Sequence, residues 1–212
     1  MDAIAKTDLL AGLPAAYPII DTGSLRKAGL EPIAMARLVA ASGMRIAQYR
    51  HKGEFDRAAF EEARDVVAEL RRAGVCCVVN DRADIAMVTG ADGVHVGQED
   101  IPPAEVRRLV GPKMIVGYST HSSEQAADEQ CGWADYVAIG PVFSTSSKQD
   151  PDPVVGLEGV AAARRATSKP LVAIGGIKLG NCRDVLEAGA DSVAAISAVT
   201  PGTLAAWAAL QR

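Results

Sequence analysis

The chain has 212 residues, of which 49% are hydrophobic and 23% charged, and its formal net charge is −4. This is the composition of an ordinary globular protein with one sizeable core, and it excludes an intrinsically disordered chain. The negative net charge and the 4% aromatic content argue against a nucleic-acid-binding surface, so we expect no nucleic-acid partner.

Short runs rich in β-branched residues recur along the chain and predict eight strands. In chain order the expected strands are residues 17–21, 44–50, 75–81, 93–97, 114–120, 136–142, 171–177 and 192–199. Stretches with a helical spacing of apolar residues lie between these runs. The expected helices are residues 32–41, 56–73, 83–89, 103–110, 123–131, 157–166, 179–188 and 203–210.

The regular alternation of strands and helices predicts a parallel sheet with right-handed crossovers. Eight repeats in a chain of this length favour closure of the sheet into a (β/α)8 TIM barrel. An open doubly wound sheet would carry a G-x-G-x-x-G turn after its first strand, whereas the turn here reads Asp21-Thr22-Gly23-Ser24. No linker or low-complexity segment interrupts the pattern, so we expect residues 1–212 to form a single domain.

The four cysteines form no C-x-x-C pair, and Cys76 and Cys77 stand side by side in an apolar run. We interpret all four as reduced, buried thiols of a cytoplasmic protein. Residues 1–10 carry charges and lack the apolar stretch of a signal peptide. No apolar run reaches the ~18 residues that a membrane-spanning helix needs, so we expect no membrane partner.

Polar residues follow several expected strands at the carboxyl-terminal end, which is where barrel enzymes place their active sites. After the second strand, Gln48, Arg50 and Lys52 lie on one face of the extended chain, and Tyr49 and His51 lie on the other. Two cations at an inward-facing strand end are costly unless an anion meets them, so this run predicts an anion site. The alternative is a solvated loop with an incidental ion pair.

Carboxylates close the third expected strand and follow the fourth. Asn80 and Asp81 end one apolar run, and Asp100 ends the next. Oxygen ligands from neighbouring strands suit Mg²⁺, which takes one or two carboxylates and completes its shell with water and phosphate oxygens. Either aspartate could instead cap the helix that follows it.

The three histidines, His51, His95 and His121, show no H-x-x-x-H spacing, so we expect no zinc site. Only His121 is expected at the mouth of the barrel, where a structural role at a helix start competes with acid–base chemistry. Ser119 lacks the context of a nucleophile elbow, which argues against an acyl-enzyme mechanism.

Two later loops carry groups that suit phosphate. Four hydroxyl residues, from Ser144 to Ser147, precede Lys148 in the loop after the sixth strand. The alternative there is a flexible serine-rich connection. Gly175-Gly176 after the seventh strand and Ile196-Ser197 at the eighth predict a second anion site, because barrels often bind phosphate on these loops near a helix N-terminus.

Taken in order, eight runs resemble the thiamine-phosphate synthase family: Q-Y-R-x-K, V-N-D, H-V-G-Q-E-D, G-x-S-T-H-S, G-P-V-F-x-T-x-S-K, G-L-E, A-I-G-G-I and A-I-S. The resemblance covers residues 46–199. It implies a transferase that couples two small molecules, a 4-amino-2-methyl-5-(diphosphooxymethyl)pyrimidine and a thiazole phosphate, and releases diphosphate. It also implies Mg²⁺ as cofactor and a dissociative substitution that needs no protein nucleophile.

The same resemblance implies roles for individual residues. The implied ligands of the pyrimidine diphosphate are Gln48, Tyr49, Arg50, His51, Lys52 and Asn80, with Ser119 and Lys148 on the pyrimidine substrate. The implied ligands of the thiazole phosphate are Thr145, Ser146, Ser147, Gly176, Ile196 and Ser197. Asp81 and Asp100 would hold Mg²⁺. We expect catalysis from Arg50, Lys52, Ser119 and Lys148.

The chain departs from the family pattern at His51, where the run is usually acidic, and at Ser147, where a second threonine is usual. Three other functions compete with the synthase. One is a thiazole tautomerase, in which His121 would transfer a proton. The others are a different phosphate-binding barrel, such as a sugar-phosphate epimerase or an indole-forming synthase, and a non-catalytic phosphate-binding protein.

Overall fold

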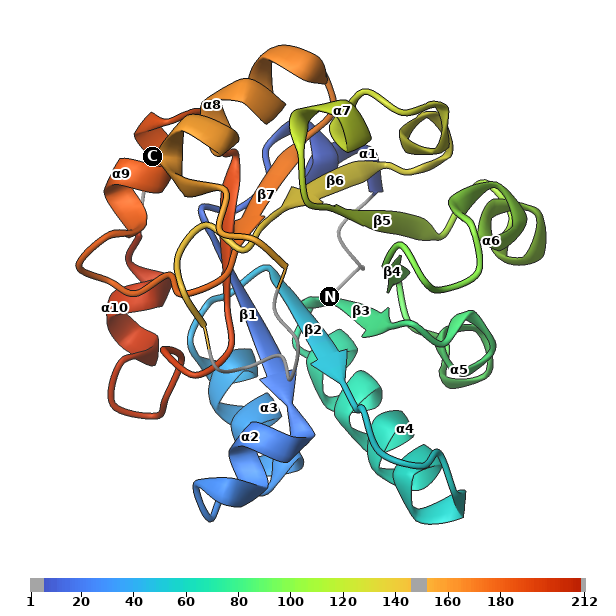
Figure 1. The fold of residues 1–212 in the computed structure, drawn as a ribbon. Coiled ribbons are helices and arrows are strands. Elements are labelled where there is room, and N and C mark those ends of the chain that lie inside the picture. The colour runs from blue at the N-terminus through green and yellow to red at the C-terminus, as the bar shows by residue number, and fades with distance from the viewer. Residues whose placement is uncertain (1–5, 146–151, 211–212) are drawn as a thin grey trace.

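Each apolar run of the sequence forms one strand of a closed, parallel barrel (Figure 1). The computed structural model describes residues 6–145 and 152–210. The strands are β1 (Ala16–Asp21), β2 (Ile46–Arg50), β3 (Cys76–Asn80), β4 (Gly93–Val96), β5 (Ile115–Thr120), β6 (Tyr136–Ile139), β7 (Leu171–Ile174) and β8 (Ser192–Ala195). Neighbours in sequence are neighbours in the sheet, and pairing of β1 with β8 closes the ring.

Helices connect the strands and surround the barrel, which confirms the predicted (β/α)8 TIM fold (Figure 1). They are α1 (Lys6–Ala11), α2 (Thr22–Lys27), α3 (Pro32–Ala41), α4 (Arg57–Arg72), α5 (Ala83–Thr89), α6 (Pro103–Val110), α7 (Ser123–Ala126), the 3-10 helix η1 (Glu129–Trp133), α8 (Gly156–Ala166), α9 (Cys182–Glu187) and α10 (Leu204–Ala208). Of the helices in the described ranges, none has both the length and the apolar character that a membrane crossing requires.

The structure corrects several predicted boundaries. Most strands end earlier than expected, and after β3 and β7 the backbone leaves the extended conformation at Asp81 and Gly175, which have positive φ. The short helices α1 and α2 were not predicted from the spacing of apolar residues. The single helix expected at 123–131 is divided into α7 and η1, because Ser122 caps the first and Asp128 caps the second.

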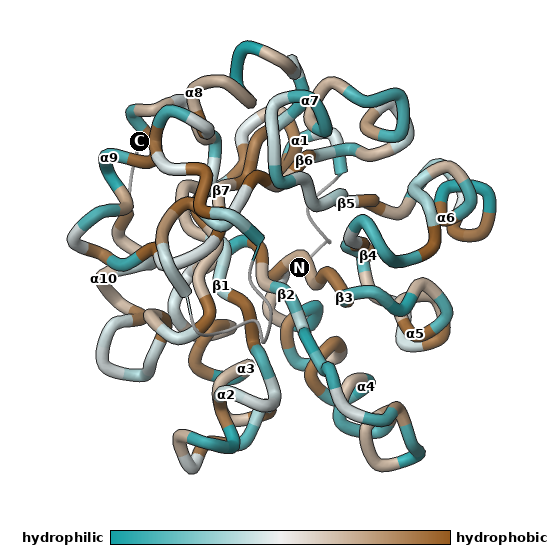
Figure 2. Tube along the Cα trace, in the orientation of Figure 1, coloured by the Kyte–Doolittle hydropathy of each residue, from teal (hydrophilic) through white to brown (hydrophobic). Residues whose placement is uncertain are grey.

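Side chains alternate between two apolar layers along each strand, as the period of a strand requires. One layer lies between the barrel and the helices and includes Val94 and Val96 of β4. The other fills the barrel interior and includes Leu9 and Leu13, which extend it at the amino-terminal end. Figure 2 shows hydrophobic colour in much of the barrel, with polar colour on many turns of the surrounding helices and at the end of β2.

A repeated ion pair fastens the amino-terminal end of the barrel. One aspartate lies just before each of β4, β6 and β8. It accepts a hydrogen bond from a backbone N–H of the preceding strand (β3, β5 or β7), and it pairs with an arginine of the helix that leads into that preceding strand. The three sets are Asp92 with Cys77 and Arg71, Asp135 with Val116 and Arg107, and Asp191 with Leu171 and Arg164. Because this end lies opposite the catalytic mouth of such barrels, we assign these contacts to stability.

Candidate active site

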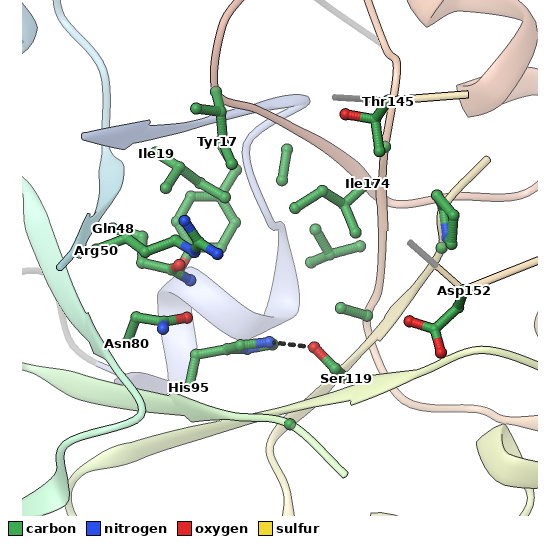
Figure 3. Close-up of a pocket in the computed structure, with 18 of the residues that line it drawn as sticks. Tyr17, Ile19, Gln48, Arg50, Asn80, His95, Ser119, Thr145, Asp152 and Ile174 are labelled. Atoms are coloured by element: carbon green, nitrogen blue, oxygen red, sulfur yellow. Dashed lines mark hydrogen bonds between the residues drawn. The ribbon is translucent and has the colours of Figure 1, made fainter. Parts of the chain in front are cut away.

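A cavity of about 420 Å³ opens at the carboxyl-terminal ends of the strands and reaches down into the barrel (Figure 3). It gathers side chains and loop backbone from the ends of all eight strands. The sequence-predicted residues that line it are Gln48, Arg50, Lys52, Asn80, Asp81, Asp100, Ser119, Thr145, Gly176, Ile196 and Ser197. Ser146, Ser147 and Lys148, also predicted from the sequence, lie outside the described residues.

Tyr49 and His51 lie outside this cavity, contrary to the expectation that they contact substrate. The fully buried Tyr49 faces the helices, and its hydroxyl donates to Glu62 of α4 at 3.0 Å. His51 places Nδ1 at 2.8 Å from the Thr22 hydroxyl and Nε2 at 3.1 Å from the Glu54 carbonyl. Side chains alternate between the two faces of an extended chain, so Tyr49 and His51, one residue on either side of Arg50, point away from the face that Arg50 occupies.

Carboxylates hold Arg50 at the end of β2 and Lys52 just beyond it. Arg50 pairs with Asp21 of β1, whose other oxygen accepts from the Ser24 N–H at 2.8 Å and so caps α2. Burial opposes ionisation of Asp21, but hydrogen bonds from Ser24 and Arg50 prevail and lower its pKa below the usual value. Lys52 Nζ lies 2.6 Å from Asp81 Oδ2. Arg50 and Lys52 are thus paired and oriented at the cavity wall.

Asp81 has an unusual backbone. Its φ is 62°, and among the described residues it is the one non-glycine with a positive value. Such a conformation is uncommon for a side-chain-bearing residue and is often found at functional sites. Burial raises the pKa of Asp81, Lys52 opposes the rise, and the neighbouring Asp100 carboxylate adds to it. The two carboxylates therefore influence each other at the mouth of the cavity.

Neither aspartate caps a helix, so that alternative is not realised. The N-cap of α5 is Arg82 and that of α6 is Pro102, both without a capping side-chain hydrogen bond. Asp100 instead accepts from the Gly97 N–H at 2.7 Å, which fixes its carboxylate at the end of β4.

Asn80 presents an unused donor to the cavity. The residue is only 8% exposed, and its Nδ2 has no hydrogen-bond partner within the described residues. Figure 3 shows the amide facing the cavity beside Gln48 and Arg50. An unpaired buried donor costs free energy, which a ligand acceptor at this position would recover.

His95 also lines the cavity, which corrects the expectation that only His121 would lie there. Val94 and Val96 face the helices, so His95 between them must face the barrel interior. The alternation of side chains in the sequence was the signal that could have placed His95 in the cavity. Burial lowers the pKa of His95 to about 4, so the ring is neutral at neutral pH. Its Nε2 lies 2.8 Å from the hydroxyl of Ser119 (Figure 3).

His121 lines the cavity just after β5, the strand next to β4. Its backbone N–H donates to Gln125 while Ser122 caps α7, so its ring is not used for capping. Nδ1 lies 2.6 Å from the Gly140 carbonyl, and Nε2 lies 3.5 Å from Asp152. Tyr17, Tyr136 and Asp152 also line the cavity and were not predicted from the sequence.

The loop after β7 depends on glycine. Gly176 has φ 64°, and a Cβ there would come within 2.6 Å of the Ser144 carbonyl oxygen and 2.7 Å of Phe143 Cβ. Only glycine allows this loop to approach the loop after β6. The following helix α9 does not start until Cys182, so the backbone N–H groups of Gly175 and Gly176 belong to a loop. The expectation that this anion site lies at a helix N-terminus is therefore corrected.

The fold and the cavity define a (β/α)8 barrel with a cavity lined by cations and carboxylates at its carboxyl-terminal mouth. Residues 16–199 match the family described as thiamine monophosphate synthase. A thiamine-phosphate synthase of Koribacter versatilis is 48% identical over 193 residues, covering 87% of this chain and 88% of that protein. One from Chloroflexus aurantiacus is 43% identical over 183 residues, covering 86% and 83%. The chain belongs to the thiamine monophosphate synthase family.

Solved structures agree with this assignment. A thiamine phosphate pyrophosphorylase from Pyrococcus furiosus superimposes with a TM-score of 0.76 at 32% identity, covering 88% of this chain and 87% of that one. The structure titled native KDPGal structure superimposes with a TM-score of 0.66 at 16% identity and shows the fold alone.

Proposed function

We propose that the protein is a Mg²⁺-dependent thiamine-phosphate synthase. It couples 4-amino-2-methyl-5-(diphosphooxymethyl)pyrimidine with 4-methyl-5-(2-phosphooxyethyl)thiazole to give thiamine phosphate and diphosphate. The observation that carries the proposal is the meeting of Arg50, Lys52, Asp81 and Asp100 at one mouth, above a cavity with the unpaired donor of Asn80. Family membership gives the arrangement its chemical meaning.

The residues present fit a magnesium ion. Asp81 and Asp100 offer two carboxylates from adjacent strand ends, and Mg²⁺ takes one or two carboxylates with water and phosphate oxygens. The described residues contain no group of three or more His, Cys, Asp and Glu side chains suited to a metal. Asp81 and Asp100 would hold the ion, and bound Mg²⁺ would neutralise charge on diphosphate oxygens.

The reaction is a substitution at the methylene carbon of the pyrimidine substrate. Its C–O bond breaks, and the electron pair leaves with diphosphate, whose charge Arg50 and Lys52 stabilise. The amino group of the pyrimidine delocalises the positive charge left on carbon. The thiazole nitrogen then donates its lone pair to form the C–N bond, so no proton transfer and no protein nucleophile are required.

The lower cavity wall protects the cationic intermediate. Ile19, Val172 and Ile174 line it with apolar surface beneath the strand ends. Excluding water there prevents hydrolysis of the activated pyrimidine before the thiazole attacks. In this proposal Ser119 and Lys148 contact the pyrimidine substrate. The residues assigned to the thiazole phosphate are Thr145, Ser146, Ser147, Gly176, Ile196 and Ser197.

The test incubates the purified protein with both substrates and Mg²⁺ and follows both products by mass spectrometry. We expect thiamine phosphate and diphosphate to appear in equal amounts, and to disappear when either substrate is omitted or EDTA is added. Arg50→Ala should lower turnover strongly while leaving the folded state intact. A folded protein that binds the thiazole phosphate but makes no product would overturn the proposal.

A second candidate function rests on His121, whose ring nitrogens face the Gly140 carbonyl and Asp152 at the cavity wall. That arrangement suits a proton-transfer isomerase acting on a thiazole. The discriminating measurement is interconversion of thiazole phosphate tautomers in the absence of the pyrimidine substrate, with His121→Asn as the comparison. Isomerisation that depends on His121, without coupling, would favour this second function.

A further inference from the structure

Five side chains from five strands form a continuous hydrogen-bond chain inside the barrel. The Tyr17 hydroxyl lies 3.1 Å from the Tyr136 hydroxyl, which lies 2.9 Å from His95 Nδ1. His95 Nε2 continues the chain to the Ser119 hydroxyl at 2.8 Å. At the other end, the amide nitrogen of Gln48 lies 3.5 Å from the Tyr17 hydroxyl. The chain therefore ends at a hydroxyl on the cavity wall (Figure 3).

The members of this chain are packed as well as hydrogen-bonded. The rings of His95 and Tyr136 stack with centroids 5.5 Å apart, and Tyr17 meets Tyr136 edge-on at 6.1 Å. All three residues are buried. Burial raises the pKa of both tyrosines and lowers that of His95, so all three groups are uncharged at neutral pH.

The donor inventory gives the chain a direction. An amide nitrogen only donates, so Tyr17 accepts from Gln48 and passes its own proton to Tyr136. Tyr136 then donates its single proton to His95 Nδ1. In the reverse direction Tyr17 would have to donate its proton toward the Gln48 amide nitrogen, which is itself a donor.

We propose that Tyr17, Tyr136 and His95 form a positioning relay that holds His95 as its Nε2–H tautomer, so that Ser119 presents its hydroxyl proton to the ligand. His95 Nε2–H occupies the Ser119 oxygen as an acceptor, which leaves the hydroxyl proton free to donate. The ligand atom opposite Ser119 is then an acceptor, such as a ring nitrogen or a diphosphate oxygen. This role deepens the proposed function and rests on it.

Gly117 supplies an independent sign that the relay is built. This glycine lies on β5 beside both rings, and a Cβ there would collide with Tyr136 and with His95 Nδ1. The site needs glycine for space at this position. Any side chain would push Tyr136 and His95 apart and break the bond between them.

The tautomer itself is measurable without any substrate. The sequence has three histidines, so the full-length protein labelled with ¹⁵N-histidine gives few ring-nitrogen signals. The signals that disappear in His95→Asn are those of His95. Two-bond ¹H–¹⁵N spectra should show His95 protonated on Nε2. Tyr136→Phe removes the donor to Nδ1 and should shift the population toward the Nδ1–H form. An Nδ1–H ring in the wild type, or an unchanged ring in Tyr136→Phe, would overturn the relay.

Two further variants serve as controls for folding and for hydroxyl loss in general. Tyr49→Phe removes a buried tyrosine hydroxyl on the outer face of the barrel, bonded to Glu62, and should leave the His95 tautomer unchanged. Gly117→Ala keeps every polar atom of the relay but separates its rings, so it should reproduce the effect of Tyr136→Phe. A tautomer unaffected by Gly117→Ala in the folded protein would count against the relay.

A double-variant cycle tests whether the relay acts through Ser119. Tyr136→Phe should lower kcat roughly tenfold with KM nearly unchanged, the effect of one misplaced hydrogen bond. In a Ser119→Ala background the same change should cost less than about twofold, because its target is gone. If Tyr136→Phe lowers kcat by the same factor with and without Ser119, the inference is overturned. If the wild-type protein has the predicted tautomer but does not join the two substrates, the proposed function is overturned and the relay is not.

Discussion

Asp21 and Arg50 are direct partners in the register of β1 and β2, and their ion pair holds the guanidinium at the cavity wall. Asp21 is only 6% exposed and also caps α2 through Ser24. One carboxylate therefore ends a strand, starts a helix and orients a cation. A buried carboxylate with two such partners fixes the position of the arginine more firmly than a surface ion pair would.

Asp21→Asn separates capping from cation positioning. Asparagine caps a helix about as well as aspartate, so α2 should remain intact while the guanidinium loses its charged partner. We expect the affinity for inorganic diphosphate with Mg²⁺, measured by calorimetry, to fall roughly tenfold. The matched control is Asp56→Asn at the N-cap of α4, which should leave the affinity unchanged. Equal affinities of wild type and Asp21→Asn would remove Asp21 from anion binding.

Asp81 links backbone strain to metal binding. Replacing it with glycine relieves the positive φ but removes the carboxylate, whereas alanine removes the carboxylate and keeps the strain. Asp81→Gly should therefore be more stable than Asp81→Ala by about 1 kcal/mol in urea denaturation. Both variants should lose Mn²⁺ binding, followed by electron paramagnetic resonance, and Mg²⁺-dependent turnover. Full metal binding in both would show that Asp81 is not a ligand.

The fold was predictable because its signal is local and repeated. Apolar runs alternate with helical spacing over the whole chain, and that pattern specifies a parallel barrel without any knowledge of long-range contacts. The helices α1 and α2 were missed because α1 buries Leu9 alone and α2 begins within Asp21-Thr22-Gly23-Ser24, which was interpreted as a turn. Strand ends were overestimated where the residue pattern continues past the ladder, as after β7, where the positive φ of Gly175 and Gly176 ends the extended backbone.

The candidate site was only partly predictable. Strand-end residues such as Arg50 and Asp81 were found because position in the strand places them at the mouth. Tyr17 and Tyr136 were missed because their contact spans 119 positions and depends on the closure of the ring. Tyr49 was included with its contiguous motif, and alternation along the strand turns its side chain toward the helices. His95 was assigned away from the mouth although the flanking valines point it inward.

The aspartate–arginine sets at the amino-terminal end should stabilise the fold without touching catalysis. Asp135 accepts from the Val116 N–H and pairs with Arg107 and Lys6. Asp135→Ala leaves these donors without their acceptor and should lower the free energy of unfolding by about 3 kcal/mol, with kcat and KM unchanged. The exposed Asp65→Ala should cost under about 0.5 kcal/mol. Equal losses in the two variants would argue against a stabilising role for Asp135.

Buried, neutral His95 should also make stability depend on pH. Its pKa is lowered by burial to about 4 in the folded state, against 6.5 for the free side chain. Between these values the unfolded chain binds a proton that the folded chain rejects, so stability must fall as pH falls through this window. The full contribution is present above pH ~6.5 and amounts to roughly 3 kcal/mol.

His95→Asn isolates this contribution. Urea denaturation of both proteins at intervals from pH ~4.5 to ~8 gives the free energy of unfolding of each, and their difference removes the effects of other titrating groups. The free energy of unfolding of the wild type minus that of His95→Asn should be constant near neutral pH and should decrease as the solution becomes acidic. Parallel curves would mean that the His95 ring accepts a proton in the folded barrel, and the Nε2–H relay to Ser119 would then hold only above the pKa at which it does so.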